Sequence, residues 1–252
     1  KDLDLLMCCT YYSRPTPNGG GIRQFVNNGK GYFTDQSNPN LPESYSGSRY
    51  LGIAAGDVDG DGDLDVAVGG QGWAWRFMVN GGDPFNTDGA FFFTKNDWLN
   101  PNTPYDKRHM LFVDLNNDKH LDAYIGQNNQ NQLWYNTGNG QMKNVSYSHL
   151  SSIADDTRKV LATDVDFDGD VDLFVINNGD NRLHVGELDY KFADVTASHL
   201  PGGLGANTTD GAFVDLDMDG YQDVVTVNYD GQNQLHGLEQ HRHGAVVHER
   251  PH

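Results

Sequence analysis

Short apolar segments alternate along the chain with polar segments rich in Gly, Asn and Asp. Between residues 156 and 206 four such segments follow one another, at residues 160–163, 173–176, 182–185 and 191–195. Short runs with β-branched and aromatic residues, bounded by turn residues, are typical of strands. No apolar run approaches the length needed to span a membrane. The pattern therefore predicts an all-β fold.

An acidic phrase with the pattern D-x-[DN]-x-D-(G)-x-x-D precedes the second strand-like segment of each unit. Its copies occupy residues 57–65, 114–122, 164–172 and 215–223. The copies recur about every 50 residues, and a period of this length is typical of propellers and solenoids. Four strands per unit correspond to one propeller blade. We therefore expect a single β-propeller domain over residues 1–252, with units at about 1–47, 48–104, 105–155, 156–206 and 207–252.

The spacing of the acidic phrase favours calcium, a hard cation that takes six to eight oxygen ligands from a flexible loop. Positions 1, 3, 5 and 9 supply side-chain oxygens, and position 7 supplies its backbone carbonyl. The expected side-chain ligands are Asp57, Asp59, Asp61, Asp65, Asp114, Asn116, Asp118, Asp122, Asp164, Asp166, Asp168, Asp172, Asp215, Asp217, Asp219 and Asp223. The expected carbonyl ligands are those of Asp63, His120, Asp170 and Tyr221. About four Ca²⁺ sites follow.

Position 6 of each loop requires a sharp turn, which Gly accommodates because it tolerates positive φ. Loop 114–122 has Lys119 at this position and Asn116 in place of an aspartate, so it is the weakest expected site. An EF-hand begins with the same spacing, but it has Glu at position 12 and continues as a helix. Here Val68, Ile125 and Val175 occupy that position within strand-like runs. A solvated acidic turn without metal is the simpler alternative, and fourfold repetition argues against it.

The N-terminus resembles the end of a fifth acidic loop. Asp2-Leu-Asp4 aligns with Asp63-Leu-Asp65, which makes Asp4 a position 9. The expected strand count is nineteen, so the first blade lacks its first strand. An upstream segment supplies that strand, another chain supplies it, or the blade stays three-stranded. Because an unpaired strand edge is a template for β-addition, self-association through this blade is one hypothesis.

The net charge is −18, and fifteen of the 35 acidic residues are expected ligands. Four Ca²⁺ ions would reduce the net charge to about −10. An acidic chain without a basic stripe argues against nucleic acid as a partner. Calcium loops suit an extracellular, secreted or cell-surface protein, and the sequons at Asn144 and Asn207 predict glycosylation. Cys8 and Cys9 are the only cysteines, so a disulfide framework is excluded, while a vicinal disulfide, free thiols and a bond to another chain stay open.

The loops and the 50-residue units resemble the FG-GAP/VCBS repeat family, the calcium-binding propellers typified by integrin α-subunit heads and fungal integrin-like lectins. The resemblance covers nearly the whole chain, and Lys119 departs from it. It implies calcium loops on one rim of a propeller. Members include adhesion receptors, lectins, surface filament components and polysaccharide lyases, and fold alone does not choose among them.

A ligand would bind on the face opposite the calcium loops, where aromatic rings and amides suit glycans. The candidate ligand-binding residues are Trp73, Trp75, Arg76, Trp98 and Tyr105. Amide-rich segments at 127–132 and 177–182 lie on the same expected face. The alternative interpretation is that the amides cap backbone groups and that the tryptophans pack between blades.

No catalytic motif is present, and the one compact candidate for an enzymatic centre is Lys107-Arg108-His109. A solvated charged segment is the alternative interpretation of these residues. His248 continues a strand-like run near the C-terminus. The sequence thus predicts a non-catalytic scaffold for adhesion, surface assembly or filament formation, with glycan or an extracellular protein as partner. A calcium-dependent polysaccharide lyase, or an accessory domain of such an enzyme, is the alternative.

Overall fold

The computed structural model describes residues 3–8, 22–36, 50–71, 75–80, 93–95, 105–138, 140–200, 207–229, 234–241 and 244–249. These residues form five small antiparallel sheets, one with three strands and four with four strands. Each sheet is a meander in which consecutive strands pair. The all-β class expected from the sequence is confirmed.

In each sheet the strands lie in chain order from the inner edge to the outer edge. The first sheet contains β1 (Leu5–Cys8), β2 (Ile22–Asn27) and β3 (Phe33–Asp35). The second contains β4 (Tyr50–Gly56), β5 (Asp65–Gly70), β6 (Trp75–Asn80) and β7 (Phe93–Lys95). The third contains β8 (Lys107–Val113), β9 (Asp122–Gln127), β10 (Gln132–Asn136) and β11 (Met142–Asn144).

The last two sheets have the same plan. The fourth contains β12 (Thr157–Thr163), β13 (Asp172–Asn177), β14 (Arg182–Glu187) and β15 (Lys191–Asp194). The fifth contains β16 (Thr208–Val214), β17 (Asp223–Asn228), β18 (Gln234–His241) and β19 (Gly244–Glu249), so His248 does lie in a strand. Two one-turn helices, α2 (Ser146–His149) and α3 (Thr196–His199), and a 3₁₀ turn, Leu188–Tyr190, complete the described elements.

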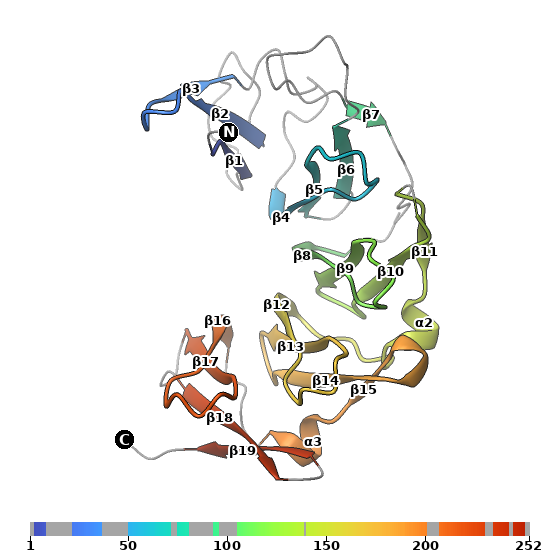
Figure 1. The fold of residues 1–252 in the computed structure, drawn as a ribbon, viewed down its shortest axis with the longest axis vertical. Helices are drawn as coiled ribbons and strands as arrows, with labels where there is room; N and C mark the ends of the chain where they lie inside the picture. Colours follow the sequence, from blue (N-terminus) through green and yellow to red (C-terminus); the bar gives the residue numbers. More distant parts are fainter. Residues whose placement is uncertain are drawn as a thin grey trace.

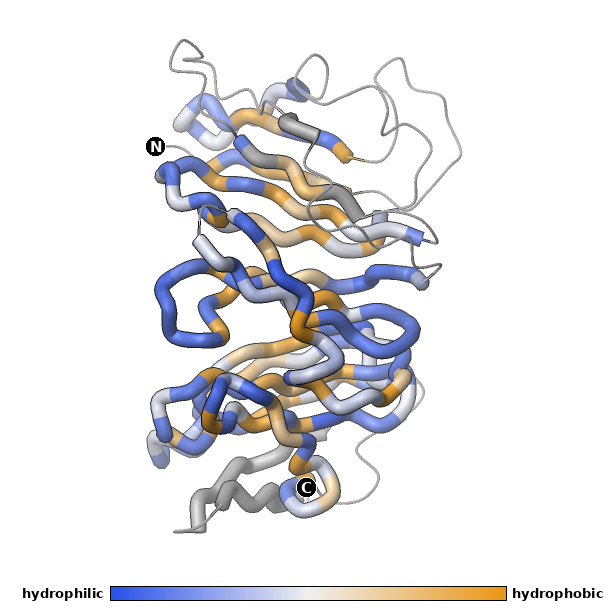
Figure 2. Tube along the Cα trace, turned by 90° about the vertical axis from the view of Figure 1, so that its right-hand side faces the viewer, coloured by the Kyte–Doolittle hydropathy of each residue, from blue (hydrophilic) through white to orange (hydrophobic). Residues whose placement is uncertain are grey.

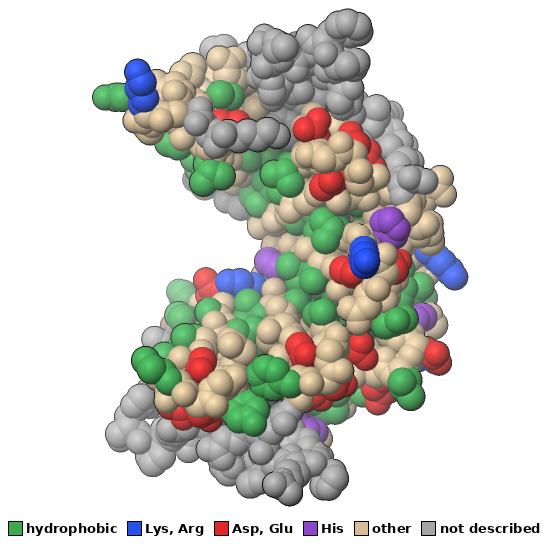
Figure 3. Space-filling view, viewed as in Figure 1, with side chains coloured by type: hydrophobic (Ala, Val, Ile, Leu, Met, Phe, Trp, Pro, Cys, Tyr) green, Lys and Arg blue, Asp and Glu red, His purple; other side chains and the backbone are tan. Residues whose placement is uncertain are grey.

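The five sheets stand side by side in an arc (Figure 1). The strands β4, β8, β12 and β16 line its inner side, and the outer strands lie on its convex side. In the described residues the arc is open, with a gap between the first and the fifth sheet that is also visible as a hollow in the space-filling view (Figure 3). The described strands therefore form part of a circle of sheets and do not close it.

The core consists of layers between neighbouring sheets, and its pattern comes from the second strand of each sheet. All six residues of β5, β9 and β13 are buried because both faces of these strands pack against another sheet. In β9, Ala123 and Ile125 pack towards the second sheet, while Tyr124 packs towards the fourth. Apolar residues accordingly occupy the middle of the strands and polar residues occupy the loops at both ends (Figure 2).

Each inner strand of the four-stranded sheets carries a register shift after its first residue. The shifts lie between Tyr50 and Gly52, Lys107 and His109, Thr157 and Lys159, and Thr208 and Asp210. The neighbouring backbones approach closely beside the shift in β4, since a Cβ on Gly52 would lie 2.8 Å from the carbonyl oxygen of Arg108. Only Gly fits there without a movement of the backbone.

Cys8 ends β1, is half-buried and packs against the core layer between the first two sheets. Cys9 lies outside the described residues. None of the described helices is long and apolar enough to cross a membrane.

Candidate metal centres

Each of the four acidic phrases forms the loop between the first and second strand of a sheet. The loops connect β4 to β5, β8 to β9, β12 to β13 and β16 to β17. They lie on one face of the arc, where acidic side chains gather over each of these sheets (Figure 3). The expected ligands therefore come together locally, one loop at a time.

One set of hydrogen bonds shapes all four loops. The carboxylate at position 1 accepts a hydrogen bond from the backbone N–H at position 6, as Asp57 does from Gly62 at 3.0 Å and Asp114 does from Lys119 at 2.8 Å. The side chain at position 5 accepts from the N–H at position 7, as Asp118 does from His120 at 2.8 Å. Because these bonds are side chain to backbone, they hold the side chains of positions 1 and 5 against the backbone of their own loop.

The aspartate at position 9 connects the loop to the sheet. Asp172 Oδ2 accepts from Val165 N at 2.7 Å, and its Oδ1 accepts from Gly186 N on β14 at 2.8 Å. Asp122 makes the corresponding bonds to Leu115 N and Asn136 N, at 2.9 and 2.8 Å. A position-9 carboxylate thus fixes the loop, the second strand and the third strand together.

These position-9 carboxylates are buried, and burial is the main cause of their raised pKa values. It raises the pKa of Asp65 to about 6 and the pKa values of Asp122 and Asp172 to about 7. The backbone N–H donors act in the opposite direction and lower the same pKa values. A buried carboxylate with a raised pKa gains most from a nearby cation, because the cation compensates for the lost hydration.

Three loops bring carboxylate oxygens within 4.8 Å of one another. The clusters are Asp57, Asp59 and Asp61; Asp164, Asp166 and Asp172; and Asp215, Asp217 and Asp223. In the third loop, Asp164 Oδ1 is buried without a hydrogen-bond partner among the described residues. Oxygen-only clusters with an unsatisfied buried carboxylate oxygen suit a hard cation. These clusters could hold a metal ion.

The second loop differs in its charge balance. Asn116 replaces a carboxylate, and its Nδ2 donates to Asp118 Oδ2 at 3.1 Å. Lys119 adopts a φ of +71°, so the position-6 turn forms although the residue is not Gly. The expected weakness of this site stays a prediction, since the position-6 residue has a positive φ here as it has in the other three loops.

Position 4 of the loops was not singled out from the sequence. Its residues also have positive φ: Gly60, Asn117, Phe167 and Met218. Two of these side chains contact position 7 of the following loop: Asn117 Nδ2 donates to Asp170 Oδ1 at 3.0 Å, and the ring of Phe167 lies 5.5 Å from that of Tyr221. Neighbouring loops therefore support one another, and no residue type shared at position 4 could have indicated this.

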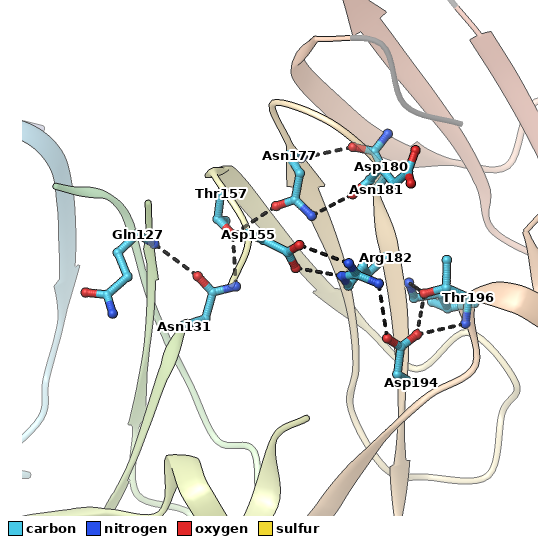
Figure 4. A network of polar contacts seen from close by, with 11 residues as sticks. Gln127, Asn131, Asp155, Thr157, Asn177, Asp180, Asn181, Arg182, Asp194 and Thr196 are labelled. Carbon is cyan, nitrogen blue, oxygen red and sulfur yellow. Dashed lines mark hydrogen bonds and ion pairs between the residues drawn. The ribbon is translucent and has the colours of Figure 1, made fainter. Parts of the chain in front are cut away.

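On the opposite face, amides connect neighbouring sheets (Figure 4). Asn131 Oδ1 accepts from Gln127 N at 3.0 Å, and its Nδ2 donates to Thr157 Oγ1 of the next sheet at 2.9 Å. Thr157 Oγ1 in turn donates to Asn177 Oδ1 at 2.9 Å. The same contacts recur at the next junction, among Asn177, Asn181, Thr208 and Asn228. The amides of segments 127–132 and 177–182 thus cap backbone and join sheets, as the alternative interpretation held.

The Arg182 side chain extends this network. Its Nε and Nη2 donate to the two carboxylate oxygens of Asp155 at 2.6 and 3.0 Å, and its Nη1 lies 3.4 Å from Asp194 Oδ2 (Figure 4). The hydrogen bond to Asp155 raises the pKa of Arg182. This bidentate pair anchors the connection between the third and fourth sheets to β14.

The structure describes few of the candidate glycan-binding residues. Trp73 and Trp98 lie outside the described residues, and only the backbones of Trp75 and Arg76 are described, in β6. Tyr105 is half-buried, and its carbonyl oxygen accepts from Lys107 Nζ at 2.6 Å. Glycan binding by these residues stays a prediction.

The candidate enzymatic residues are engaged within the inner strands, so the interpretation as a solvated charged segment is wrong. Lys107 is fully buried at the start of β8, and burial lowers its pKa. Arg108 pairs with Asp156 at 2.5 Å. His109 Nδ1 accepts from Val160 N at 3.3 Å, and burial lowers the pKa of His109 to about 4. Arg108 and His109 thus connect the third sheet to the fourth unit, while Lys107 bonds to the segment before its own strand.

The hydrogen bonds of the sequon at Asn144 recur at the equivalent position of the neighbouring sheet. Asn144 Oδ1 accepts from the N–H and the hydroxyl of Ser146, at 3.0 and 2.8 Å. Asp194 accepts from Thr196 in the same way at the end of β15. The residues Asn144 and Ser146 therefore form part of the repeated strand ending, and glycosylation of Asn144 and Asn207 stays a prediction.

The comparison with family models agrees with this repeat plan. A model of the FG-GAP-like repeat matches residues 1–68, 114–175 and 164–226. None of the curated proteins matches the chain. A solved structure of the Photorhabdus luminescens Tc holotoxin pore is similar over 86% of this chain, with 17% identity and a TM-score of 0.46, and the chain spans 11% of that toxin chain.

Domains of FG-GAP repeats are generally non-catalytic and typically occur in extracellular proteins. The matched segments cover more than half of the sequence and include all four acidic loops in full. The chain therefore belongs to the family of FG-GAP-like repeat proteins.

Proposed function

We propose that the chain is a calcium-dependent, non-catalytic scaffold of a secreted or cell-surface protein, which supports adhesion or surface assembly. Its five sheets are blades of a single β-propeller domain over residues 1–252, and the first blade has three strands among the described residues. The position-9 carboxylates carry this proposal. Asp65, Asp122 and Asp172 each join their loop to the third strand of the sheet, so a cation bound in the loop would stabilise the sheet itself.

Calcium fits the loops better than magnesium or a transition metal does. All the expected ligands are oxygen atoms: the loops contain no cysteine, and their one histidine, His120, is expected to bind through its backbone carbonyl. In each loop the side chains of positions 1, 3, 5 and 9 would hold Ca²⁺, with the carbonyl of position 7. Mg²⁺ requires near-ideal octahedral geometry at about 2.0–2.1 Å and is less suited to a flexible acidic loop.

A structural function follows from the position of the loops. They lie at the ends of strands whose side chains form the core, and no described carboxylate outside them is needed to complete a set of ligands. A ligand that binds only the folded state stabilises it by about 2.7 kcal/mol at 100 times its Kd. For a domain of this size that corresponds to roughly 5–10 °C in Tm for each site.

The test is thermal unfolding of the full chain in millimolar calcium, in excess chelator, and in chelator with magnesium. We expect chelation to lower Tm by at least about 10 °C, and we expect calcium, but not magnesium, to restore it. Circular dichroism at 25 °C monitors whether the chelated protein keeps its strands. An unchanged Tm in excess chelator would refute the structural role of calcium.

A further inference from the structure

The residue at position 4 of each acidic loop lies between two expected calcium ligands, those at positions 3 and 5. Gly60, Asn117, Phe167 and Met218 occupy this position with φ values of +80°, +56°, +60° and +62°. Gly adopts such a φ at little steric cost and Asn tolerates it, whereas a bulky residue is a genuine outlier there. The Phe167 side chain is also 56% exposed. Neither backbone preference nor burial in the core therefore accounts for an aromatic residue at this position, and an outlier of this kind points to a function.

The Phe167 ring contacts the next loop along the arc. Its centroid lies 5.5 Å from that of the Tyr221 ring at an interplanar angle of 69°, which is an edge-to-face contact. Tyr221 is position 7 of the fourth loop, the position expected to supply a carbonyl ligand, and its N–H donates to Asp219 Oδ1 at 2.9 Å. A side chain between two ligands of the third loop thus touches a residue that carries a ligand of the fourth.

Asn117 makes the equivalent connection from the second loop to the third. Its Nδ2 donates to Asp170 Oδ1 at 3.0 Å and lies 3.4 Å from Gly169 O. Asp170 is position 7 of the third loop, and its N–H donates to Asp168 Oδ1 at 2.9 Å. The amide contact and the aromatic contact are chemically unlike, but they join the same two positions of neighbouring loops.

The connection between the first and second loops is of another kind. Gly60 has no side chain, and nothing among the described residues lies within 4 Å of a Cβ placed on it. Instead Asn136 on β10 donates through Nδ2 to Val58 O of the first loop at 2.7 Å and to Leu121 O of the second at 3.2 Å. The first loop is therefore joined to its neighbour from the side of the sheet and not through position 4.

The first sheet shows which bonds an asparagine at this place makes within its own sheet. Asn27 N donates to Asp4 Oδ1 at 2.8 Å, and Asn27 Nδ2 donates to Leu3 O at 3.1 Å. Asp4 is thus a position-9 aspartate in structure as well as in sequence. The bond of Asn136 to Val58 is additional to this pattern.

We propose that the second, third and fourth loops bind calcium cooperatively, and that the side chains of Asn117 and Phe167 transmit the coupling. A bound ion fixes positions 3 and 5 of its loop and, with them, the position-4 residue between them. The position-4 side chain then holds position 7 of the next loop, so the next ion binds a loop whose ordering costs less. This inference rests on the proposed function of the loops as calcium sites.

Tyr221 makes the coupling between the third and fourth loops measurable. Terbium is a luminescent substitute for calcium, and a tyrosine beside the bound ion sensitises its emission. The part of the signal that Tyr221→Phe removes therefore belongs to the fourth loop. Asp166→Ala removes the position-3 ligand of the third loop. In the full chain we expect Asp166→Ala to weaken terbium binding at the fourth loop by at least about fivefold.

Phe167→Asn separates transmission from binding. Asn suits a positive φ, as Asn117 shows, and it lacks the ring that contacts Tyr221. In this background we expect Asp166→Ala to leave terbium binding at the fourth loop unchanged. The matched control is Met218→Asn, which makes the same kind of exchange at position 4 of the fourth loop, where the side chain is 89% exposed. The effect of Asp166→Ala should persist in this control.

The same design tests Asn117. His120→Tyr places a tyrosine at position 7 of the second loop, and Tyr221→Phe silences the fourth loop in the same chain. Because coupling between binding sites is reciprocal, Asp166→Ala should weaken terbium binding at the second loop. Asn117→Gly, which gives this loop the position-4 residue of the first loop, should abolish that effect.

The proposal is overturned if the fourth loop binds terbium equally well with and without Asp166→Ala. It is also overturned if the effect persists in Phe167→Asn or disappears in Met218→Asn, because the Phe167 ring then does not carry the coupling. Circular dichroism checks that each variant is folded, and Asp166→Asn, which keeps the shape of the side chain, replaces Asp166→Ala if that variant unfolds. Absence of any terbium or calcium binding, together with equal melts in calcium and chelator, would instead refute the calcium proposal itself.

Discussion

The second and third acidic loops share the same main hydrogen bonds to the backbone, but the charges of their side chains differ. In both, position 1 accepts from position 6, and position 9 accepts from position 2 and from the third strand. The third loop leaves Asp164 Oδ1 buried without a partner among the described residues. Burial, followed by repulsion from nearby carboxylates, raises the pKa of Asp166. The second loop supplies an amide from Asn116 to Asp118 and a cation at Lys119.

This comparison separates what the fold needs from what a metal needs. The hydrogen bonds alone suffice to shape a loop, since the second loop keeps them with a less favourable ligand set. In the second loop Asp114 Oδ1 accepts from Asp118 N at 3.1 Å, whereas no described residue donates to Asp164 Oδ1 in the third loop. We therefore expect the third loop to depend on calcium and the second loop to depend on it less.

The largest effect should come from removing the position-9 carboxylate in each loop. Asp172→Ala and Asp122→Ala each delete an acceptor of two backbone N–H groups, and hydrogen bonds to charged groups contribute about 1.5–3 kcal/mol each. In chelator we expect similar losses of roughly 2–3 kcal/mol in the free energy of unfolding, measured with urea, less than the sum of the two bonds because removal of a buried carboxylate also relieves its desolvation. In calcium, Asp172→Ala should lose more, because it also loses a metal site. Equal losses of the two variants in calcium would remove the distinction between the loops.

The pH dependence should test the burial that the two loops share. Asp122 and Asp172 have pKa values of about 7 in the folded chain without metal, above the usual value of 3.8. The folded state thus binds more protons than the unfolded state between about pH 4 and 7, so the chelated protein should gain stability as the pH falls through this window. The apparent calcium affinity should fall over the same window, because protons compete with the metal.

Thermal melts at pH 8, 7, 6 and 5, with calcium and with chelator, measure this prediction. The two series should converge as the pH falls. If the chelated protein instead loses stability steadily from pH 8 to 5, the raised pKa values of the position-9 carboxylates do not control its stability.

The strands and the acidic loops were predictable because they repeat. Alternation of apolar residues and the spacing of aspartates are local signals, and Asp4 could be recognised as a position 9 from six residues. The sheet junctions were not predictable in the same way. The amides at Asn131 and Asn181 resemble ligand-binding residues in sequence, and only their distance to Thr157 and Thr208 shows that they join sheets.

The burial of a charged side chain was also not predictable from the sequence. Lys107 begins an inner strand at the position that Thr157 and Thr208 occupy elsewhere, and a lysine among charged neighbours indicates solvent. In the structure it is fully buried, with its ammonium on the carbonyl of Tyr105. The register shift that puts it there depends on pairing with β9, which no local pattern reveals.

The smallest effect should come from exchanging the position-6 residues of the two loops. Lys119 has a φ of +71° and Gly169 has a φ of +97°, and a residue with a side chain is strained there by about 1 kcal/mol or more. Lys119→Gly should therefore stabilise the chelated protein by up to about 1 kcal/mol, offset in part by the greater chain entropy that Gly has when unfolded. Gly169→Lys should destabilise it, although nothing lies within 4 Å of the added Cβ.

Calcium titration of the same two variants sharpens the contrast between the loops. Lys119→Gly removes a positive charge that repels the incoming calcium ion, so it should raise the calcium affinity of the second loop. Gly169→Lys adds such a charge and should lower the calcium affinity of the third loop. Because charge and strain change together, Lys119→Met is the matched variant: it removes the charge and keeps a side chain at positive φ. If Lys119→Met reproduces the affinity gain of Lys119→Gly without its gain in stability, charge weakens the second site and the turn does not. If Lys119→Met leaves the affinity unchanged, the turn limits the site.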